Sequence, residues 1–127
     1  MVSDAEARKI ADEFANLAVQ QYHEFKEFLT LYHHSEKRID LLNKTAKFFF
    51  GELQCMYVHL IILNVSKLAD PPETRGHKNL SVRGIHDYFR SGTTCYPTQE
   101  AEKLVAGIEN RARAVSKWRS KLLAHYD

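Results

Sequence analysis

Apolar residues recur at steps of three and four over most of the chain, which is the spacing of an amphipathic α-helix. Three long stretches have this spacing, residues 4–33, 36–68 and 98–126, and a short one covers residues 82–90. No stretch alternates between apolar and polar residues as a half-buried strand does. The pattern therefore predicts an all-α fold, an up-down helical bundle of three long helices and one short helix, in a single domain over residues 1–127.

Capping and helix-breaking residues predict where these helices begin and end. Serine or threonine, whose hydroxyl oxygen accepts a hydrogen bond from the first helical turn, stands at each expected start: Ser3, Ser35, Ser81 and Thr98. Pro71 and Pro72 cannot continue the second helix because proline lacks an amide hydrogen, so residues 70–79 are expected to form a polar connector. Gly51 marks a local weakness or a point of close approach within the second helix.

The second helix is apolar nearly all round in its middle. Its core-facing residues are expected to be Ile39, Leu42, Ala46, Phe49, Leu53, Met56, Leu60 and Leu63. Such a helix is expected to be buried on more than one side, either under other helices or in a dimer interface. Lys47, Glu52 and His59 interrupt its apolar run, so we expect no membrane span.

The composition of the chain indicates its cellular compartment and shows an uneven distribution of charge. The length of 127 residues and the apolar fraction of 44% suit one globular core. Two cysteines make no disulfide framework, and the N-terminus lacks the basic and apolar regions of a secretory signal, so a cytoplasmic location is expected. The net charge of +2 is too small to indicate a nucleic-acid partner by itself. The charges are unevenly distributed, however, because acidic residues gather in the first 30 residues whereas the last helix is basic. That asymmetry points to an anionic partner at the C-terminal end.

The last helix carries the most informative chemistry. Its apolar stripe is expected at Leu104, Ile108, Ala112, Val115, Leu122 and Tyr126. Its basic residues form either an electrostatic track for RNA or an ordinary solvated helix face: Arg111, Arg113, Lys117 and Lys121. Trp118 is able to stack on a base, although a lone tryptophan on a helix is more often part of a core or an interface.

Two residues near the end of this helix suit phosphate chemistry. Arg119 offers a planar fork of N–H donors for a phosphate, and His125 has a side chain that transfers protons near neutral pH. Residues six apart on an ideal helix point about 120° away from one another, so a single chain brings this pair together poorly. The alternative is that Arg119 pairs with an acid and His125 simply stabilises a helix C-terminus.

These residues also carry a resemblance to a known family. Arg119 followed after five residues by His125 resembles the Arg-x(4–6)-His motif of HEPN domains, and residues 119–127 resemble the form found in abortive-infection proteins of the AbiU type. The connector agrees, because residues 68–72 (Leu-Ala-Asp-Pro-Pro) and 78–81 (Lys-Asn-Leu-Ser) resemble the corresponding segment of that branch. HEPN domains are helical bundles, which fits the fold expected from the pattern.

The resemblance implies a metal-independent endoribonuclease of the toxin or abortive-infection kind. It implies RNA as the partner, no cofactor and no metal ion, a homodimer with a composite active site, and an antitoxin protein as a further partner. Arg119 would bind phosphate, Ser120 would assist, and His125 would act as acid and base. Active members commonly have Asn, Asp or His where this chain has Ser120. That departure keeps an alternative open, a non-catalytic HEPN-like helical module that binds RNA, a nucleotide or a protein partner.

Histidines elsewhere invite a metal interpretation. His33 and His34 are adjacent, and His23 and His59 lie on other turns. No pair of histidines or cysteines has the spacing of a zinc site with a matching second half. We therefore expect no metal site.

Overall fold

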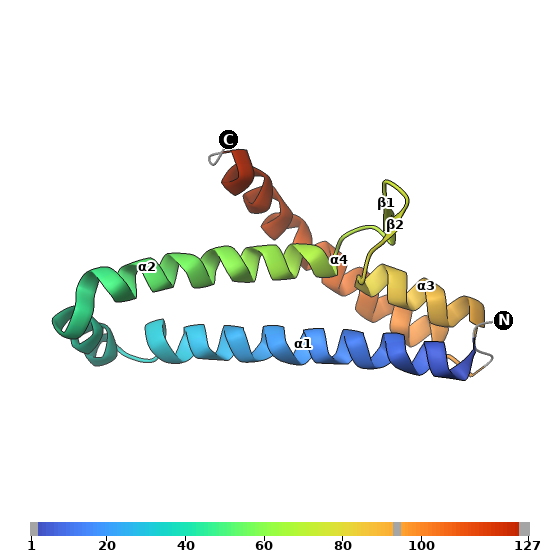
Figure 1. Cartoon of the computed structure of the whole chain (residues 1–127), viewed down its shortest axis with the longest axis horizontal. Coiled ribbons are helices and arrows are strands. Elements are labelled where there is room, and N and C mark those ends of the chain that lie inside the picture. Colours follow the sequence, from blue (N-terminus) through green and yellow to red (C-terminus); the bar gives the residue numbers. More distant parts are fainter. Residues whose placement is uncertain (1–2, 93–94, 125–127) are drawn as a thin grey trace.

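The computed structural model describes residues 3–92 and 95–124, and these residues form the expected all-α bundle (Figure 1). Two long helices, α1 (Asp4–Tyr32) and α2 (Glu36–Leu68), form an antiparallel hairpin. The short helix α3 (Val82–Gly92) and the third long helix α4 (Thr98–Ala124) pack against one end of that hairpin. The predicted number, order and relative lengths of the helices are confirmed.

Three of the four expected capping residues cap their helices. The hydroxyl oxygens of Ser3, Ser35 and Ser81 accept hydrogen bonds from amides three residues onward, at 3.2, 3.3 and 3.2 Å. The prediction for Thr98 is wrong, because α4 already includes this residue. Its hydroxyl instead donates to the carbonyl oxygen of Tyr96 at 3.3 Å, and the carbonyl oxygen of Pro97 accepts from the Ala101 amide at 3.0 Å.

The connector contains a small hairpin that the sequence pattern did not predict. Strands β1 (Glu73–Thr74) and β2 (His77–Lys78) pair in antiparallel fashion. Arg75 and Gly76 form the two-residue turn between them, both with positive φ, 52° and 81°. That geometry matches the right-handed twist of a hairpin and suits glycine at the second position. Strands of two residues are too short to produce a visible alternation of apolar and polar positions.

Helix α2 bends at Ala46 rather than at Gly51. Ala46 has non-helical angles, φ −159° and ψ 72°, and nothing lies within 4 Å of the position that a Cβ on Gly51 would occupy. Gly51 is therefore no point of close approach. The hydroxyl of the preceding Thr45 donates to the carbonyl oxygen of Leu41 at 2.7 Å, a side-chain bond of the kind that bends helices.

Most of the core lies where α3 and α4 meet the C-terminal end of α2. Among the described residues the buried apolar side chains are Val82, Val105 and Ala112 at that end, and Leu42 near the start of α2. The expected stripe of α4 is therefore wrong by one position at its start, because Val105 is buried whereas Leu104 is 70% exposed. The seven-residue step from Val105 to Ala112 continues to Arg119, so the inner face of α4 ends in an arginine.

The expected core face of α2 is only partly covered. Leu42 is buried, but Phe49 and Met56, further along the same face, are 61% and 66% exposed. No other described segment covers them. Of the apolar middle of α2, residues 61–65 are half-buried, whereas the part around Phe49 and Met56 is not buried under other helices among the described residues.

Candidate nucleic-acid interface on the C-terminal helix

Arg119 lies on the inner face of α4 and is paired with an acid. Its Nη1 donates to Oδ1 of Asp70 at 3.0 Å, and the two side chains are 33% and 29% exposed. Asp70 directly follows Ala69, the C-cap of α2, so the pair joins the start of the connector to the C-terminal part of α4. The alternative in which Arg119 pairs with an acid is therefore observed.

The pair with Asp70 still leaves Arg119 capacity to bind an anion. A guanidinium carries five N–H groups, and among the described residues Asp70 accepts from only one of its nitrogens. About a third of the Arg119 side chain faces solvent. A phosphate at the surface of α4 is therefore able to use the remaining donors without breaking the bond to Asp70.

The other two predicted catalytic residues are not brought to Arg119 by the described geometry. Ser120 is exposed, and its hydroxyl donates to the carbonyl oxygen of Ser116 at 3.3 Å. His125 lies outside the residues that the structure describes. The pairing of Arg119 with His125 therefore stays a prediction.

The four predicted RNA-binding residues are all exposed, but they do not form one track. Arg113, Lys117 and Lys121 follow at four-residue steps and therefore lie along one side of α4. Arg111 precedes Arg113 by two residues, so it points about 160° away from Arg113 and does not continue that row. We call Arg113, Lys117 and Lys121 the basic row.

An exposed aromatic ring borders the basic row. Trp118 is 60% exposed, and Nζ of Lys121 lies 5.3 Å from the centre of its ring, within the range of a cation–π contact. The interpretation of Trp118 as a core residue is wrong within the described part of the chain. The ring and the row together present cations and a flat apolar face on the surface of α4.

A second charged cluster joins α3 to α4, and the sequence analysis missed it. Arg83 donates to both carboxylate oxygens of Glu102, at 2.8 and 2.9 Å, and to those of Glu109, at 2.7 and 2.9 Å. The sequence held a clue, because Glu102 and Glu109 are seven residues apart and so share a face of α4. Hydrogen bonds from Arg83 hold the pKa of Glu109 below its ordinary value, and both carboxylates raise the pKa of Arg83.

The same cluster contains a buried histidine. His86 is 1% exposed, its Nδ1 lies 3.1 Å from the hydroxyl of Tyr96, and its Nε2 lies 3.0 Å from Oε2 of Glu102. The contact with Glu102 lacks hydrogen-bond geometry, so it is an ion pair only when the imidazole is protonated. Burial raises the pKa of Tyr96, and the nearby carboxylates raise it further. This cluster fixes α3 on α4 and so sets the position from which the basic row extends.

Among the described residues, no group of three or more His, Cys, Asp or Glu side chains is placed to hold a metal ion. The histidines that invited a metal interpretation, His23, His33, His34 and His59, belong to no such group.

Comparisons of the chain with known protein families, with curated proteins and with solved structures found no match. The function of α4 is therefore inferred from the chemistry of its residues. Its exposed face offers cations and one aromatic ring, and its inner face ends in an arginine held by an aspartate. This set of groups suits a polyanion that carries bases.

Proposed function

We propose that this protein binds RNA along the exposed side of α4 and cleaves it without a metal ion, as a HEPN-type endoribonuclease acting as a homodimer. The observation that carries the proposal is the basic row, which lies on the same helix as Arg119 and next to the exposed ring of Trp118. The HEPN-like motifs of the sequence add the nuclease chemistry. Cations that follow a helix contact successive phosphates and contribute affinity without sequence preference.

Each group has one task in the proposed reaction. Arg119 binds the scissile phosphate through the N–H groups that Asp70 does not use. His125 removes the proton from the ribose 2′ hydroxyl, whose oxygen then attacks phosphorus. The bond from phosphorus to the 5′ oxygen breaks, and that oxygen takes up a proton. The products are a 2′,3′-cyclic phosphate and a 5′ hydroxyl, so neither an oxidant nor a water molecule is consumed.

In the proposed homodimer, an arginine and a histidine from two different chains come together, which a single helix does not allow. Residues six apart on a helix diverge by about 120°, so Arg119 and His125 of one chain do not face the same point. Two copies of α4 arranged about a two-fold axis bring the arginine of one copy toward the histidine of the other. An antitoxin protein that covers the basic row would block such a site.

A second function, RNA binding without cleavage, is favoured by the environment of Arg119 and Ser120. The guanidinium is already engaged by Asp70, and the hydroxyl of Ser120 donates to the backbone of its own helix. Both contacts are ordinary structural interactions that need no catalytic role. A helical module that binds RNA, a nucleotide or a protein partner would keep them unchanged.

The decisive experiment incubates labelled RNA with the wild type, His125→Ala and His34→Ala in the presence of EDTA, and identifies the ends of any product. His34 is exposed at the tip of the hairpin and serves as the matched control. We expect wild type and His34→Ala to produce cyclic phosphate ends at the same rate. His125→Ala should cleave about 100-fold more slowly or not at all, as loss of an acid–base group predicts.

Two outcomes would reject the proposed mechanism. Equal cleavage by His125→Ala would show that His125 is not the acid–base group. No cleavage by the folded wild type, together with RNA binding that weakens as salt rises, would favour the binding module instead.

A further inference from the structure

We propose that the exposed apolar face of α2 is the contact surface between two copies of this chain. This face, here called the α2 seam, consists of Phe49, Leu53, Met56, Leu60 and Leu63. The homodimer is part of the proposed function, on which the inference rests for its biological meaning. The location of the interface is argued from the surface of the chain alone.

The α2 seam is apolar and partly open to solvent in the single chain. Phe49 and Met56 are 61% and 66% exposed, Leu60 is 38% exposed, and Leu53 and Leu63 are half-buried. A water-soluble monomer rarely leaves several large apolar side chains in one contiguous row uncovered. Removing such a row from water contributes about 25 cal/mol for each Å² buried.

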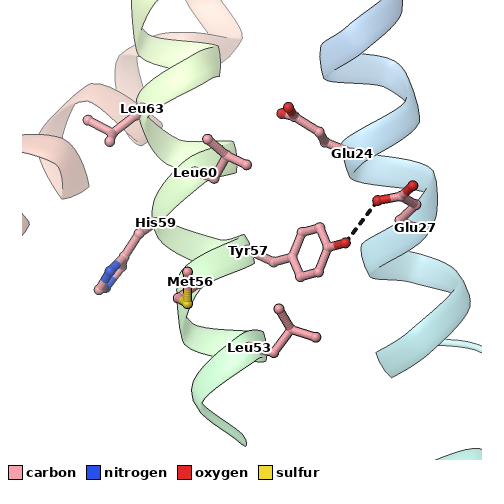
Figure 2. Close-up of a pocket in the computed structure, with 8 residues that line it drawn as sticks. All are labelled: Glu24, Glu27, Leu53, Met56, Tyr57, His59, Leu60 and Leu63. Carbon is pink, nitrogen blue, oxygen red and sulfur yellow. Dashed lines mark hydrogen bonds between the residues drawn. The ribbon is translucent and has the colours of Figure 1, made fainter. Parts of the chain in front are cut away.

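A groove runs beside the α2 seam, between α2 and α1 (Figure 2). It has a volume of about 470 Å³, and Leu53, Met56, Leu60 and Leu63 line it from α2. The acids on its α1 side already have partners within the chain. Glu24 accepts a hydrogen bond from Asn64 at 2.7 Å, and Glu27 accepts one from Tyr57 at 2.8 Å. A partner that covers the groove therefore buries apolar surface without leaving these two carboxylates buried and unpaired.

The accessible surface of the chain is too large for a compact monomer. It measures 9891 Å², whereas a folded monomer of 14.7 kDa is expected to expose about 6,900 Å². A standard protein interface buries about 800 Å² on each partner, and obligate homodimers bury more. The excess of roughly 3,000 Å² is therefore sufficient for a stable homodimer interface.

The spacing of the α2 seam suits packing against a second copy of itself. Its residues follow at steps of four, three, four and three, which is the heptad spacing of helices that pack side by side. The seam is also nearly symmetric about Met56, because Phe49 precedes it by seven residues and Leu63 follows it by seven. Two antiparallel copies with their two-fold axis at Met56 place Phe49 of one copy against Leu63 of the other, as a self-complementary interface requires.

A lipid bilayer is the competing occupant of this surface. Helix α2 is long enough and apolar enough to cross a membrane, although a single such helix is weak support for a span. Helix α1 argues against it, because it lies along α2 and brings charged side chains with it. Glu24 and Glu27 of α1 are hydrogen-bonded directly to α2, so a bilayer around α2 would have to accept both carboxylates.

The test measures the mass of the full chain in detergent-free buffer, by light scattering, for wild type, Met56→Glu and Leu104→Glu. Leu104 is the matched control, since it is 70% exposed but lies on α4, away from the α2 seam. At about 50 μM, well above the Kd of an ordinary specific interface, wild type and Leu104→Glu should have twice the 14.7 kDa of one chain. Met56→Glu should have the mass of one chain, with the helical content of wild type by circular dichroism.

Three outcomes would overturn the inference. A folded wild type with the mass of a single chain has no such interface. A Met56→Glu variant that stays dimeric, whatever the mass of Leu104→Glu, has its interface elsewhere than on the α2 seam. Recovery of the wild type only from membranes, or only in detergent, assigns the surface to lipid. Because the readout is mass, a dimer that cleaves no RNA keeps this inference and rejects only the nuclease.

A cross-link tests the antiparallel arrangement separately. In a chain with Cys55→Ser and Cys95→Ser, Met56→Cys should form a disulfide between the two copies under mild oxidation, because the two-fold axis passes by this position. The control, Leu104→Cys in the same background, should remain reduced. Absence of the Met56→Cys cross-link in a chain that is dimeric by mass would overturn the antiparallel arrangement.

Discussion

Asp70 and Arg119 are 49 residues apart in the chain and are joined by a hydrogen bond of 3.0 Å between Oδ1 and Nη1. The aspartate lies in the connector and the arginine in the C-terminal motif, the two segments on which the proposed HEPN-type function rests. These two segments, far apart in the sequence, meet in space. The aspartate also fixes the direction of the guanidinium.

Replacing Asp70 with Asn should free the guanidinium of Arg119. Because both side chains are about a third exposed, the lost ion pair should lower the free energy of unfolding by less than about 1 kcal/mol. RNA binding should become tighter, since the negative charge of the carboxylate no longer lies beside the bound phosphate. Thermal unfolding and titration with labelled RNA measure the two effects.

The control for this prediction is Asp40→Asn, which removes the same charge from an exposed position near the start of α2. It should leave both quantities unchanged. Weaker RNA binding by Asp70→Asn, with Asp40→Asn like wild type, would instead mean that Asp70 positions Arg119 for the phosphate.

Neutralising the basic row should weaken RNA binding in a salt-dependent way. With Arg113, Lys117 and Lys121 all changed to Gln, the slope of log K against log salt should fall by about 2, since each phosphate contact to single-stranded RNA contributes about 0.7. Binding isotherms at several salt concentrations provide the slope. Three exposed lysines away from α4, changed to Gln, form the control that should keep the wild-type slope: Lys26, Lys37 and Lys44.

The contact between Arg83 and Glu109 predicts a loss of stability in acid. Because Arg83 lowers the pKa of Glu109 in the folded protein, the folded state binds the proton less readily than the unfolded state does. The stability that this contributes is complete above about 4.3, the pKa of an unfolded glutamate, and disappears as pH falls through the lower folded pKa. The melting temperature of wild type should therefore exceed that of Glu109→Gln most at neutral pH, and the difference should shrink in acid.

A double variant identifies the cause of this pH dependence. In an Arg83→Met chain the group that contributes most to lowering the pKa of Glu109 is gone, so adding Glu109→Gln should change the slope of melting temperature against pH much less than it does in wild type. An unchanged difference in that background would assign the effect to another group.

Replacing two helical glycines by alanine should change the free energy of unfolding in opposite directions. A Cβ at Gly84 would lie 2.9 Å from the carbonyl oxygen of Asn79, so Gly84→Ala should cost about 1–3 kcal/mol through displacement of backbone. Nothing lies within 4 Å of the corresponding position at Gly107. There alanine should stabilise α4 by about 0.5–1 kcal/mol, the difference in helix propensity. Denaturant unfolding measures both, and a stable Gly84→Ala would show that the connector is able to shift.

The helices were predictable because their signals are local. Ser3, Ser35 and Ser81 cap helices through hydrogen bonds to the amide three residues onward. Pro71 prevents α2 from continuing because proline has no amide hydrogen. The expected bounds of α1 and α2 agree with the structure to within one residue. Such features depend on neighbours in the sequence and not on the arrangement of the helices.

What the sequence did not predict depends on contacts between helices. The inner face of α4 contains Val105 rather than Leu104 because α3 meets α4 through Arg83 and its two glutamates, and this contact sets the rotation of α4. The same rotation places Arg119 beside Asp70, a partner that lies 49 residues away. A local sequence pattern does not indicate which acidic residue elsewhere in a helical bundle will pair with a given arginine.

The hairpin of α1 and α2 is braced at one end only, since α3 and α4 pack near the N-terminus of α1 and the C-terminus of α2 (Figure 1). Its other end is a layer of two helices in which Leu42 is the buried apolar residue among those described, and the bend at Ala46 lies close by. Local opening needs the least free energy where few side chains are buried. Amide hydrogens near the 33–35 turn should therefore exchange with solvent well before those around Ser66 and Val82, and proteases should cut this tip first.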